Sequence, residues 1–141
     1  MFEVDVRAGA FDVADAHARL SALGPKMGAI VTFTGQVRDE PLFIEHFPGM
    51  AEREMRRVME EARARWPLLG AILVHRHGRL EVGAPIVLVA TAAAHRAEAF
   101  AAAEFLMDYL KTSAPFWKRG IDGWVEARAS DAAARARWEQ A

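Results

Sequence analysis

The spacing of apolar and polar residues along the chain predicts a mixture of strands and helices. Apolar side chains at every second position, or runs of β-branched residues, predict strands at residues 2–6, 28–37, 42–47, 71–80, 85–91 and 123–127. Apolar steps of three and four residues predict helices at residues 12–23, 50–66, 94–111 and beyond residue 130. Because strands and helices do not alternate regularly, a doubly wound nucleotide-binding fold is disfavoured. The pattern predicts an α+β fold with a mixed sheet.

Local stop and start signals set the helix boundaries. Asp12 is typical of an N-cap, and Pro67 ends the second helix. Pro115 has no N–H to donate and disfavours helical geometry in the preceding residue, so the third helix should stop near Thr112. Ser130 together with Asp131 is predicted to cap the last helix.

Length and composition indicate one domain. The chain has 141 residues and is 52% hydrophobic, enough for a substantial core, and no repeat or linker divides residues 1–141. The first residues lack a basic region followed by an apolar run, so no signal peptide is expected. The longest apolar run, residues 85–94, is about half the length of a membrane helix. We therefore expect a soluble, cytoplasmic protein without a membrane segment.

Charge and cysteine content exclude several functions. Lys plus Arg total 18 against 19 Asp plus Glu, and a net charge of −1 argues against a nucleic-acid binder that works by bulk charge. The arginines of residues 50–66 alternate with glutamates, which indicates a solvated helix face. Since the chain has no cysteine, disulfides, thiolate zinc sites and cysteine nucleophiles are excluded. Any sulfur in its chemistry must arrive on another molecule.

The strongest candidate for chemistry is the pair Lys111 and Lys118, seven residues apart across Pro115. Crowding with Arg119 and burial beside aromatic residues would favour a neutral amine, which can act as a nucleophile or proton acceptor. A second interpretation needs no site, because a lysine is favoured at a helix C-terminus and aromatic residues after a helix often pack into the core. Both interpretations stand at this point.

Other cations could bind an anion. His95 and Arg96 fall between a predicted strand and the start of the third helix, where free N–H groups and the helix dipole attract phosphate. They could equally be a helix cap and a solvated side chain. Arg38, at a strand end, is by itself more typical of an ordinary surface residue.

Recognisable catalytic motifs are few. His75 and His77 alternate on one face of a predicted strand, but no third metal ligand lies nearby in the sequence, so a structural or solvated role is favoured and no metal site is expected. The order of a Ser-His-Asp triad, a P-loop and a dinucleotide glycine pattern are absent. A site made of cations and amines suits a phosphorylated or carboxylate-bearing substrate.

Five ordered blocks carry a family resemblance. They are VTFTGQVR at 31–38, EHFPGM at 45–50, AHR at 94–96, MDYLKTSAPFWKR at 107–119 and WVEAR at 124–128. Together they resemble the large, catalytic subunit of molybdopterin synthase, the MoaE family, over about residues 28–138.

The resemblance implies a fold, partners and a reaction. The implied fold is an α/β-hammerhead, and the implied assembly is a homodimer with a small ubiquitin-like sulfur-carrier subunit at each end, a heterotetramer. That subunit would carry sulfur as a C-terminal thiocarboxylate and deliver it to cyclic pyranopterin monophosphate, forming the dithiolene of molybdopterin. This sulfurtransferase activity needs no resident cofactor or metal.

The resemblance also implies the site residues. Lys111 and Lys118 correspond to the family's two essential lysines. Substrate contacts are implied for Arg38, His95 and Arg96, and with them for Gln36, Val37, Arg119 and Gly120. A helix over residues 94–111 separates its ends by roughly 24 Å. A second copy would therefore have to bring its own His95 and Arg96 to the lysines.

One departure from the family leaves alternatives open. Only residues 39–44, DEPLFI, lie between Arg38 and Glu45, where the family usually has a longer loop. The pocket edge would then be more open, or another segment would cover it. The alternatives to the enzyme are a non-catalytic scaffold that binds the ubiquitin-like partner and a plain binding module for a phosphorylated pterin.

Overall fold

The computed structural model describes residues 1–112, 115–121, 123–125 and 129–139. Its elements in chain order are β1 (Phe2–Arg7), α1 (Val13–Ser21), β2 (Ala29–Gln36), β3 (Leu42–His46), α2 (Met50–Arg65), β4 (Leu68–Arg76), β5 (Gly78–Leu80), β6 (Pro85–Ala93), α3 (Arg96–Thr112), β7 (Phe116–Gly120), β8 (Gly123–Val125) and α4 (Ala129–Glu139). As expected, α3 ends at Thr112, ahead of Pro115.

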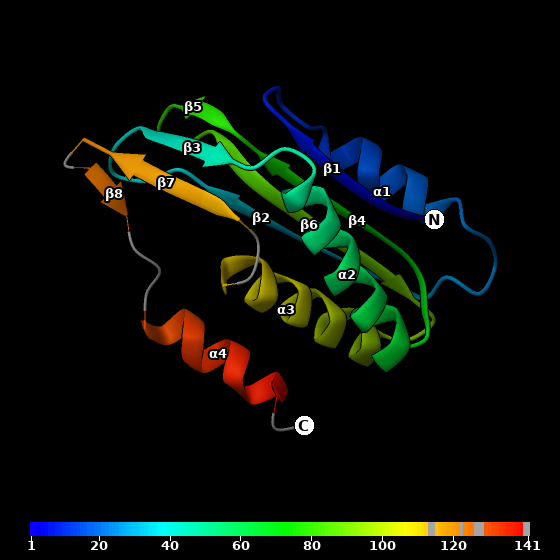
Figure 1. Cartoon of the computed structure of the whole chain (residues 1–141). Coiled ribbons are helices and arrows are strands. Elements are labelled where there is room, and N and C mark those ends of the chain that lie inside the picture. The colour runs from blue at the N-terminus through cyan, green and yellow to red at the C-terminus, as the bar shows by residue number, and fades with distance from the viewer. Residues whose placement is uncertain (113–114, 122, 126–128, 140–141) are drawn as a thin grey trace.

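The strands form two sheets (Figure 1). The first has the order β1-β4-β6-β2, in which β1 runs parallel to β4 and the other neighbours are antiparallel. The second has the order β5-β3-β7-β8 and is antiparallel throughout. The predicted α+β class with a mixed sheet is confirmed, and the division into two sheets is the feature that the sequence pattern did not show.

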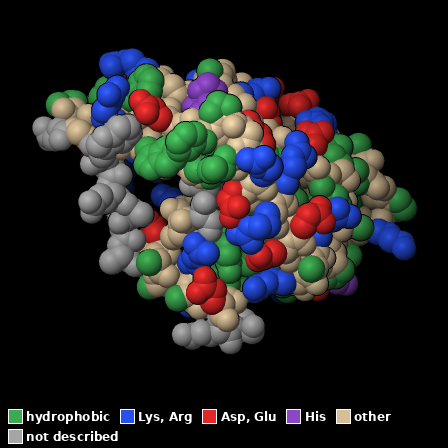
Figure 2. Space-filling view, in the orientation of Figure 1, with side chains coloured by type: hydrophobic (Ala, Val, Ile, Leu, Met, Phe, Trp, Pro, Cys, Tyr) green, Lys and Arg blue, Asp and Glu red, His purple; other side chains and the backbone are tan. Residues whose placement is uncertain are grey.

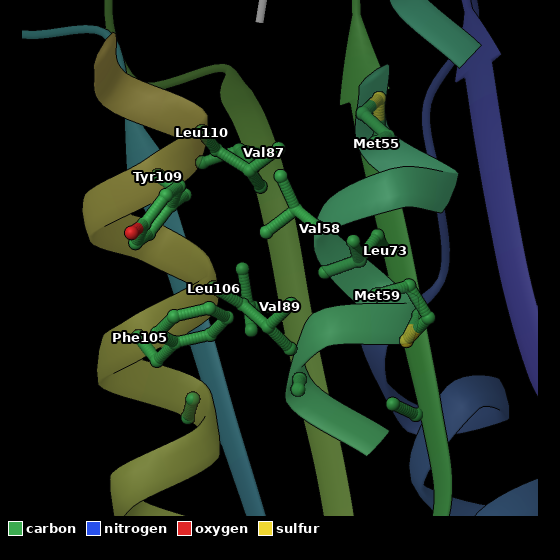
Figure 3. Packing of buried hydrophobic residues seen from close by; sticks show 13 residues of the cluster. Met55, Val58, Met59, Leu73, Val87, Val89, Phe105, Leu106, Tyr109 and Leu110 are labelled. Carbon is green, nitrogen blue, oxygen red and sulfur yellow. The ribbon is translucent and has the colours of Figure 1, made fainter. Parts of the chain in front are cut away.

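Helices cover both faces of the first sheet. On one face α2 and α3 enclose the largest core cluster, in which Leu73 of β4 lies beside Met59 of α2 and Val89 of β6 lies beside Leu106 of α3 (Figure 3). On the other face Leu20 of α1 packs against the next β4 residue, Val74. Because successive strand residues point to opposite faces, a strand buried on both sides is apolar at nearly every position. This is why residues 71–74 are all apolar.

Small residues hold α3 close to the sheet. Ala99 is fully buried at the start of α3, and the Thr91 hydroxyl donates a 2.7 Å hydrogen bond to its carbonyl oxygen. Before β2, a side chain at Gly28 would place its Cβ 2.0 Å from the Ala94 carbonyl oxygen, so only glycine fits there. These contacts fix where α3 begins.

The strand register places several functional candidates at one end of the first sheet. Gln36 pairs with Pro85 and His75 pairs with Val87, so the ends of β2 and β4 lie beside the start of β6. Since α3 follows the end of β6 and packs back along the sheet, its C-terminus returns to that same end (Figure 1). The second sheet joins the first there through a small core cluster, composed of Val37, Ile44, Leu80 and Ile86.

Two expectations about strands are wrong. Residues 71–80 were expected to form one strand, but β4 ends at Arg76 and β5 begins at Gly78 in the other sheet. Gly78 has a φ of +93°, a conformation that lets the chain turn between the sheets. Residues 116–120 are not among the predicted strands, yet they form β7, which pairs with β3 from an earlier part of the chain and with β8 directly after it.

The C-terminal region agrees with the predictions in part. The last strand covers Gly123–Val125, and the remaining predicted strand residues, 126–127, lie outside the described residues. The last helix begins at Ala129, so Ser130 lies within it rather than before it. Trp138 of α4 donates from its ring N–H to Asp108 of α3 at 2.7 Å and packs edge-on against Trp66. Over the described ranges, no helix has the length and apolarity needed to cross a membrane.

Candidate active site

Lys118 lies in the middle of β7, between β3 and β8. It pairs with Ile44 on one side and Val125 on the other. Alternation along the strand makes Phe116 and Lys118 half-buried, while Trp117 and Arg119 are exposed. The strand therefore points the Lys118 side chain toward the interior of the molecule, in the direction of the first sheet.

Lys111 approaches Lys118 from the last turn of α3, where its side chain is exposed. Burial, and then the positive charge of Lys111, lower the pKa of Lys118, and the carboxylate of Asp131 in α4 partly opposes them. The lower pKa makes the neutral amine more available at neutral pH than in an ordinary lysine. The two lysines are thus brought together by a helix end and a strand, as the first interpretation of the sequence required.

His75 completes the interior side of this site. It is buried near the end of β4, and its ring stacks on Phe116 with centroids 3.7 Å apart and planes inclined by 11°. Burial, and to a smaller extent the charges of Lys118 and Lys111, lower the pKa of His75 to about 4. The imidazole is therefore neutral at neutral pH.

Two further histidines extend the stack of rings. His46 pairs with Phe116 in the sheet, and the two ring centroids are 6.1 Å apart. The ring of His77 follows at 4.2 Å from that of His46. Burial, followed by the charge of His46, lowers the pKa of His77. An open pocket of about 310 Å³ lies here, lined by Phe43, Ile44, Glu45, His46, His77 and Gly78.

The expectation that His75 and His77 alternate on one face of a single strand is wrong. The two histidines do not share a strand, since β4 ends at Arg76, and their rings contact Phe116 and His46 instead. Among the residues that the structure describes, no three His, Asp or Glu side chains gather as a metal site would require.

Three candidates from β2 and the residues after it reach the same end of the molecule. Gln36 and Arg38 are exposed where β2 ends. Val37 between them is buried in the small core cluster, its N–H donates to the Ala84 carbonyl and its own carbonyl accepts from Gly83. Val37 therefore shapes this region through the core, while its two neighbours face solvent.

The remaining candidates on β7 differ in their surroundings. Arg119 is exposed on the side of the strand opposite Lys118, and its guanidinium lies 5.1 Å from the centre of the Phe43 ring. Gly120 ends β7 and pairs with Gly123. Both lie within two residues of Lys118, but Gly120 is on the same side of β7 as the lysine and Arg119 is on the opposite side.

His95 and Arg96 lie at the other end of α3. Both are exposed, and the His95 carbonyl oxygen accepts a hydrogen bond from Ala99 in the first turn. The 17 residues of α3 span about 25 Å, so these two side chains and Lys111 cannot share one site within a single copy. The separation expected from the sequence is confirmed.

Sequence reasoning missed three residues that surround Lys118. His75 was considered only as a metal ligand or a structural residue, His46 was not considered, and Asp131 was assigned to a helix cap. The contact of His75 with Phe116 joins β4 to β7, and the charge of Asp131 acts from α4. No local spacing links these elements, so the sequence held no signal that would place them together.

Fold and candidate site together describe an α+β domain that brings two amines close together, an arrangement suited to an anionic or carbonyl-bearing ligand. The family model described as MoaE protein matches residues 6–113. The chain belongs to the MoaE family, as the resemblance of its five sequence blocks indicated.

Named relatives and a solved structure agree with this assignment. The molybdopterin synthase catalytic subunit of Cereibacter sphaeroides is 60% identical over 79% of this chain and 82% of its own length. The protein of the same name from Brucella melitensis is 46% identical over 97% of this chain and 91% of its own length. The solved molybdopterin cofactor biosynthesis protein E from Burkholderia multivorans is 48% identical, covers 99% of this chain and 97% of its own, and superposes with a TM-score of 0.88.

Proposed function

We propose that this chain is the catalytic subunit of a molybdopterin synthase. It transfers sulfur from the thiocarboxylated C-terminus of a small ubiquitin-like subunit to cyclic pyranopterin monophosphate and so forms the dithiolene of molybdopterin. The observation that carries this proposal is the pairing of Lys118 with Lys111, in which burial and the neighbouring charge lower the pKa of a half-buried amine. We place the protein in the cytoplasm and treat residues 1–141 as one domain.

The two lysines have different surroundings and therefore different roles. In this transfer the thiocarboxylate sulfur bonds to a carbon of the pterin and displaces an oxygen there, which gives a thioester. Water then adds to the acyl carbon, where negative charge develops on oxygen, and the acyl C–S bond breaks to leave sulfur on the pterin and a carboxylate on the partner. Lys111, exposed at the end of α3, supplies positive charge to that oxygen. Lys118, whose pKa is lowered, accepts and returns the proton that the transfer requires.

Substrate binding needs cations from both ends of the molecule. Arg38 lies at the lysine end and provides charge for an anionic group of the pterin. His95 and Arg96 lie about 25 Å away, so they serve the site of a second copy in a homodimer. The edge position of β2 in the first sheet, where Phe33 is exposed, supports such an association.

The small partner needs a surface beside the lysines. Phe47, Met50 and Trp117 are exposed, and the rings of Phe47 and Trp117 meet edge to face at 5.1 Å. Figure 2 shows hydrophobic side chains gathered over β3, β7 and the start of α2. Because Trp117 is the neighbour of Lys118 on β7, a partner seated here has its C-terminal tail within reach of the site. One partner on each copy of a dimer gives a heterotetramer.

The test is turnover by lysine variants with thiocarboxylated partner and cyclic pyranopterin monophosphate. We expect Lys118→Ala to lower kcat by roughly 10²- to 10⁴-fold, and Lys118→Arg to fail as well, since arginine keeps the charge but cannot give up its proton. Lys26→Ala, which alters the exposed lysine between α1 and β2, is the control and should turn over normally. Absence of dithiolene product with the unmodified chain, or an unimpaired Lys118→Ala variant, would refute the proposal.

A further inference from the structure

The contact between His75 and Phe116 joins the two sheets next to the lysines. His75 is the second-last residue of β4 in the first sheet, and Phe116 is the first residue of β7 in the second. Their rings stack in parallel, with centroids 3.7 Å apart and 11° between the planes. His75 itself is buried, so this contact belongs to the interior of the molecule.

The hydrogen bonding of His75 fixes its ring. Nδ1 lies 2.8 Å from the carbonyl oxygen of Arg76. Because a carbonyl oxygen only accepts, Nδ1 carries the proton and donates it. Burial chiefly, with the charges of Lys118, Lys111 and His46, lowers the pKa of His75 to about 4. A neutral ring can therefore occupy this position without adding a cation beside the two amines.

Phe116 lies two residues before Lys118 on the same strand, so its position is linked to that of the lysine. Residues two apart in a strand point to the same side, so Phe116 and Lys118 share the half-buried side of β7. The ring of His46 lies on Phe116 as well, with centroids 6.1 Å apart and planes inclined by 21°. Phe116 is thus in contact with two imidazoles, one from each sheet, just before the reactive lysine.

We propose that His75 is a positioning residue of the sulfur-transfer site, which by stacking on Phe116 holds β7 where Lys118 stays half-buried beside Lys111. The effect of His75 on turnover rests on the proposed function. Its effect on the placement of Lys118 is a property of the chain alone and is measurable without any substrate.

The substrate-free experiment compares the reactivity of the lysines. The chain contains Lys26, Lys111 and Lys118 and no others, so partial acetylation at a series of pH values, read by peptide mass spectrometry, gives a midpoint for each amine. In the unmodified chain the midpoint of Lys118 should lie below that of the exposed Lys26. In His75→Ala, β7 is released and the Lys118 midpoint should rise toward that of Lys26.

Two variants separate positioning from general loss of packing. Val74→Ala truncates the neighbouring buried residue of β4, which packs on the opposite face against α1, and should leave the Lys118 midpoint unchanged. His75→Phe keeps a flat ring for Phe116 and should restore the midpoint of the unmodified chain. A Phe variant that behaves like the Ala variant, or an Ala variant with an unchanged midpoint, would overturn the assignment.

Turnover provides the second readout. A misplacement of about 1 Å can cost up to 100-fold in rate, so we expect His75→Ala to lower kcat about tenfold or more while KM changes little. His75→Phe should recover most of that loss, and Val74→Ala should keep the kcat of the unmodified chain. If the unmodified chain transfers no sulfur, the proposed function fails, and the acetylation midpoints still decide the role of His75.

Discussion

At the scale of single residues, His75 shows how burial changes what a side chain can do. The sequence favoured a structural or solvated role over metal binding for this residue, and the structure gives it a hydrogen bond to a carbonyl oxygen and a stacked phenyl ring. Lys118 is the complementary case, because the same burial that keeps an imidazole neutral also favours the neutral amine. His75 is in contact with Phe116 of the other sheet, and the charge of Lys111 in α3 adds to the effect of burial on Lys118.

The lowered pKa of His75 predicts a loss of stability in mild acid. In the unfolded chain this histidine binds a proton below about pH 6.5, while in the folded chain it does so only near pH 4. The unfolded state therefore binds more protons between these values, so the free energy of unfolding falls as the pH is lowered through them. Across this pH range, the protonation of His75 lowers the free energy of unfolding by about 3 kcal/mol in total.

Urea unfolding at several pH values measures this effect. His75→Phe cannot take up the proton, so its free energy of unfolding should depend less on pH than that of the unmodified chain between about pH 6.5 and 4. His77, whose pKa is also lowered, acts in the same direction in both proteins and cancels in the comparison. Parallel pH profiles for the two proteins would contradict the prediction.

At the scale of elements, α3 and β7 place the two lysines. α3 ends at Thr112 for a reason visible in the sequence, since Pro115 follows. β7 has no comparable local signal, because Trp117, Lys118 and Arg119 are not an apolar alternation and its partners β3 and β8 decide its structure. The helix could therefore be predicted, while the strand that carries Lys118 could not.

The hydrogen bond from Thr91 to Ala99 predicts a specific cost for α3. Thr91→Val keeps the shape of the side chain but leaves the buried Ala99 carbonyl oxygen without this donor, and should lower the free energy of unfolding by roughly 1–3 kcal/mol. Thr91→Ser retains the hydroxyl and is the matched control. Thermal or urea unfolding should rank the serine variant above the valine variant, and the reverse order would show that the hydrogen bond adds nothing to stability.

At the scale of the whole molecule, one copy cannot bring all the candidate cations together. Arg38, Lys111 and Lys118 lie at the end of the first sheet where the second sheet joins it, whereas His95 and Arg96 lie at the opposite end of α3. α4 adds Asp131 near Lys118 and is held on α3 by Trp138. The functional unit of the proposal is therefore the dimer.

Mixed dimers test this arrangement directly. Lys118→Ala and Arg96→Ala should each be nearly inactive alone. In a mixed dimer one of the two sites has both an unaltered Lys118 and an unaltered Arg96, and the other site has neither. Random mixing makes half of the dimers mixed, each with one working site of two, so it should restore about a quarter of the activity of the unmodified chain. A mixture that stays at the level of the two parents would show that the two ends do not serve a shared site.

The sequence by itself determined the fold class, the extent of α3 and the family. These follow from apolar spacing, from Pro115 and from five ordered blocks of residues, all of which are local in the chain. The pairing of Lys111 and Lys118 was visible as a possibility, with an ordinary structural interpretation beside it.

Only the tertiary structure decided which groups surround those lysines. The break at Gly78 sends the chain into a second sheet, and the pairing of β7 with β3 brings Phe116 against His75 and His46. Pairing between strands far apart in sequence depends on packing and burial rather than on local preference. Lys118 lies two residues after Phe116 on the same strand, so the burial that lowers its pKa could be found only once β7 had its place in the second sheet.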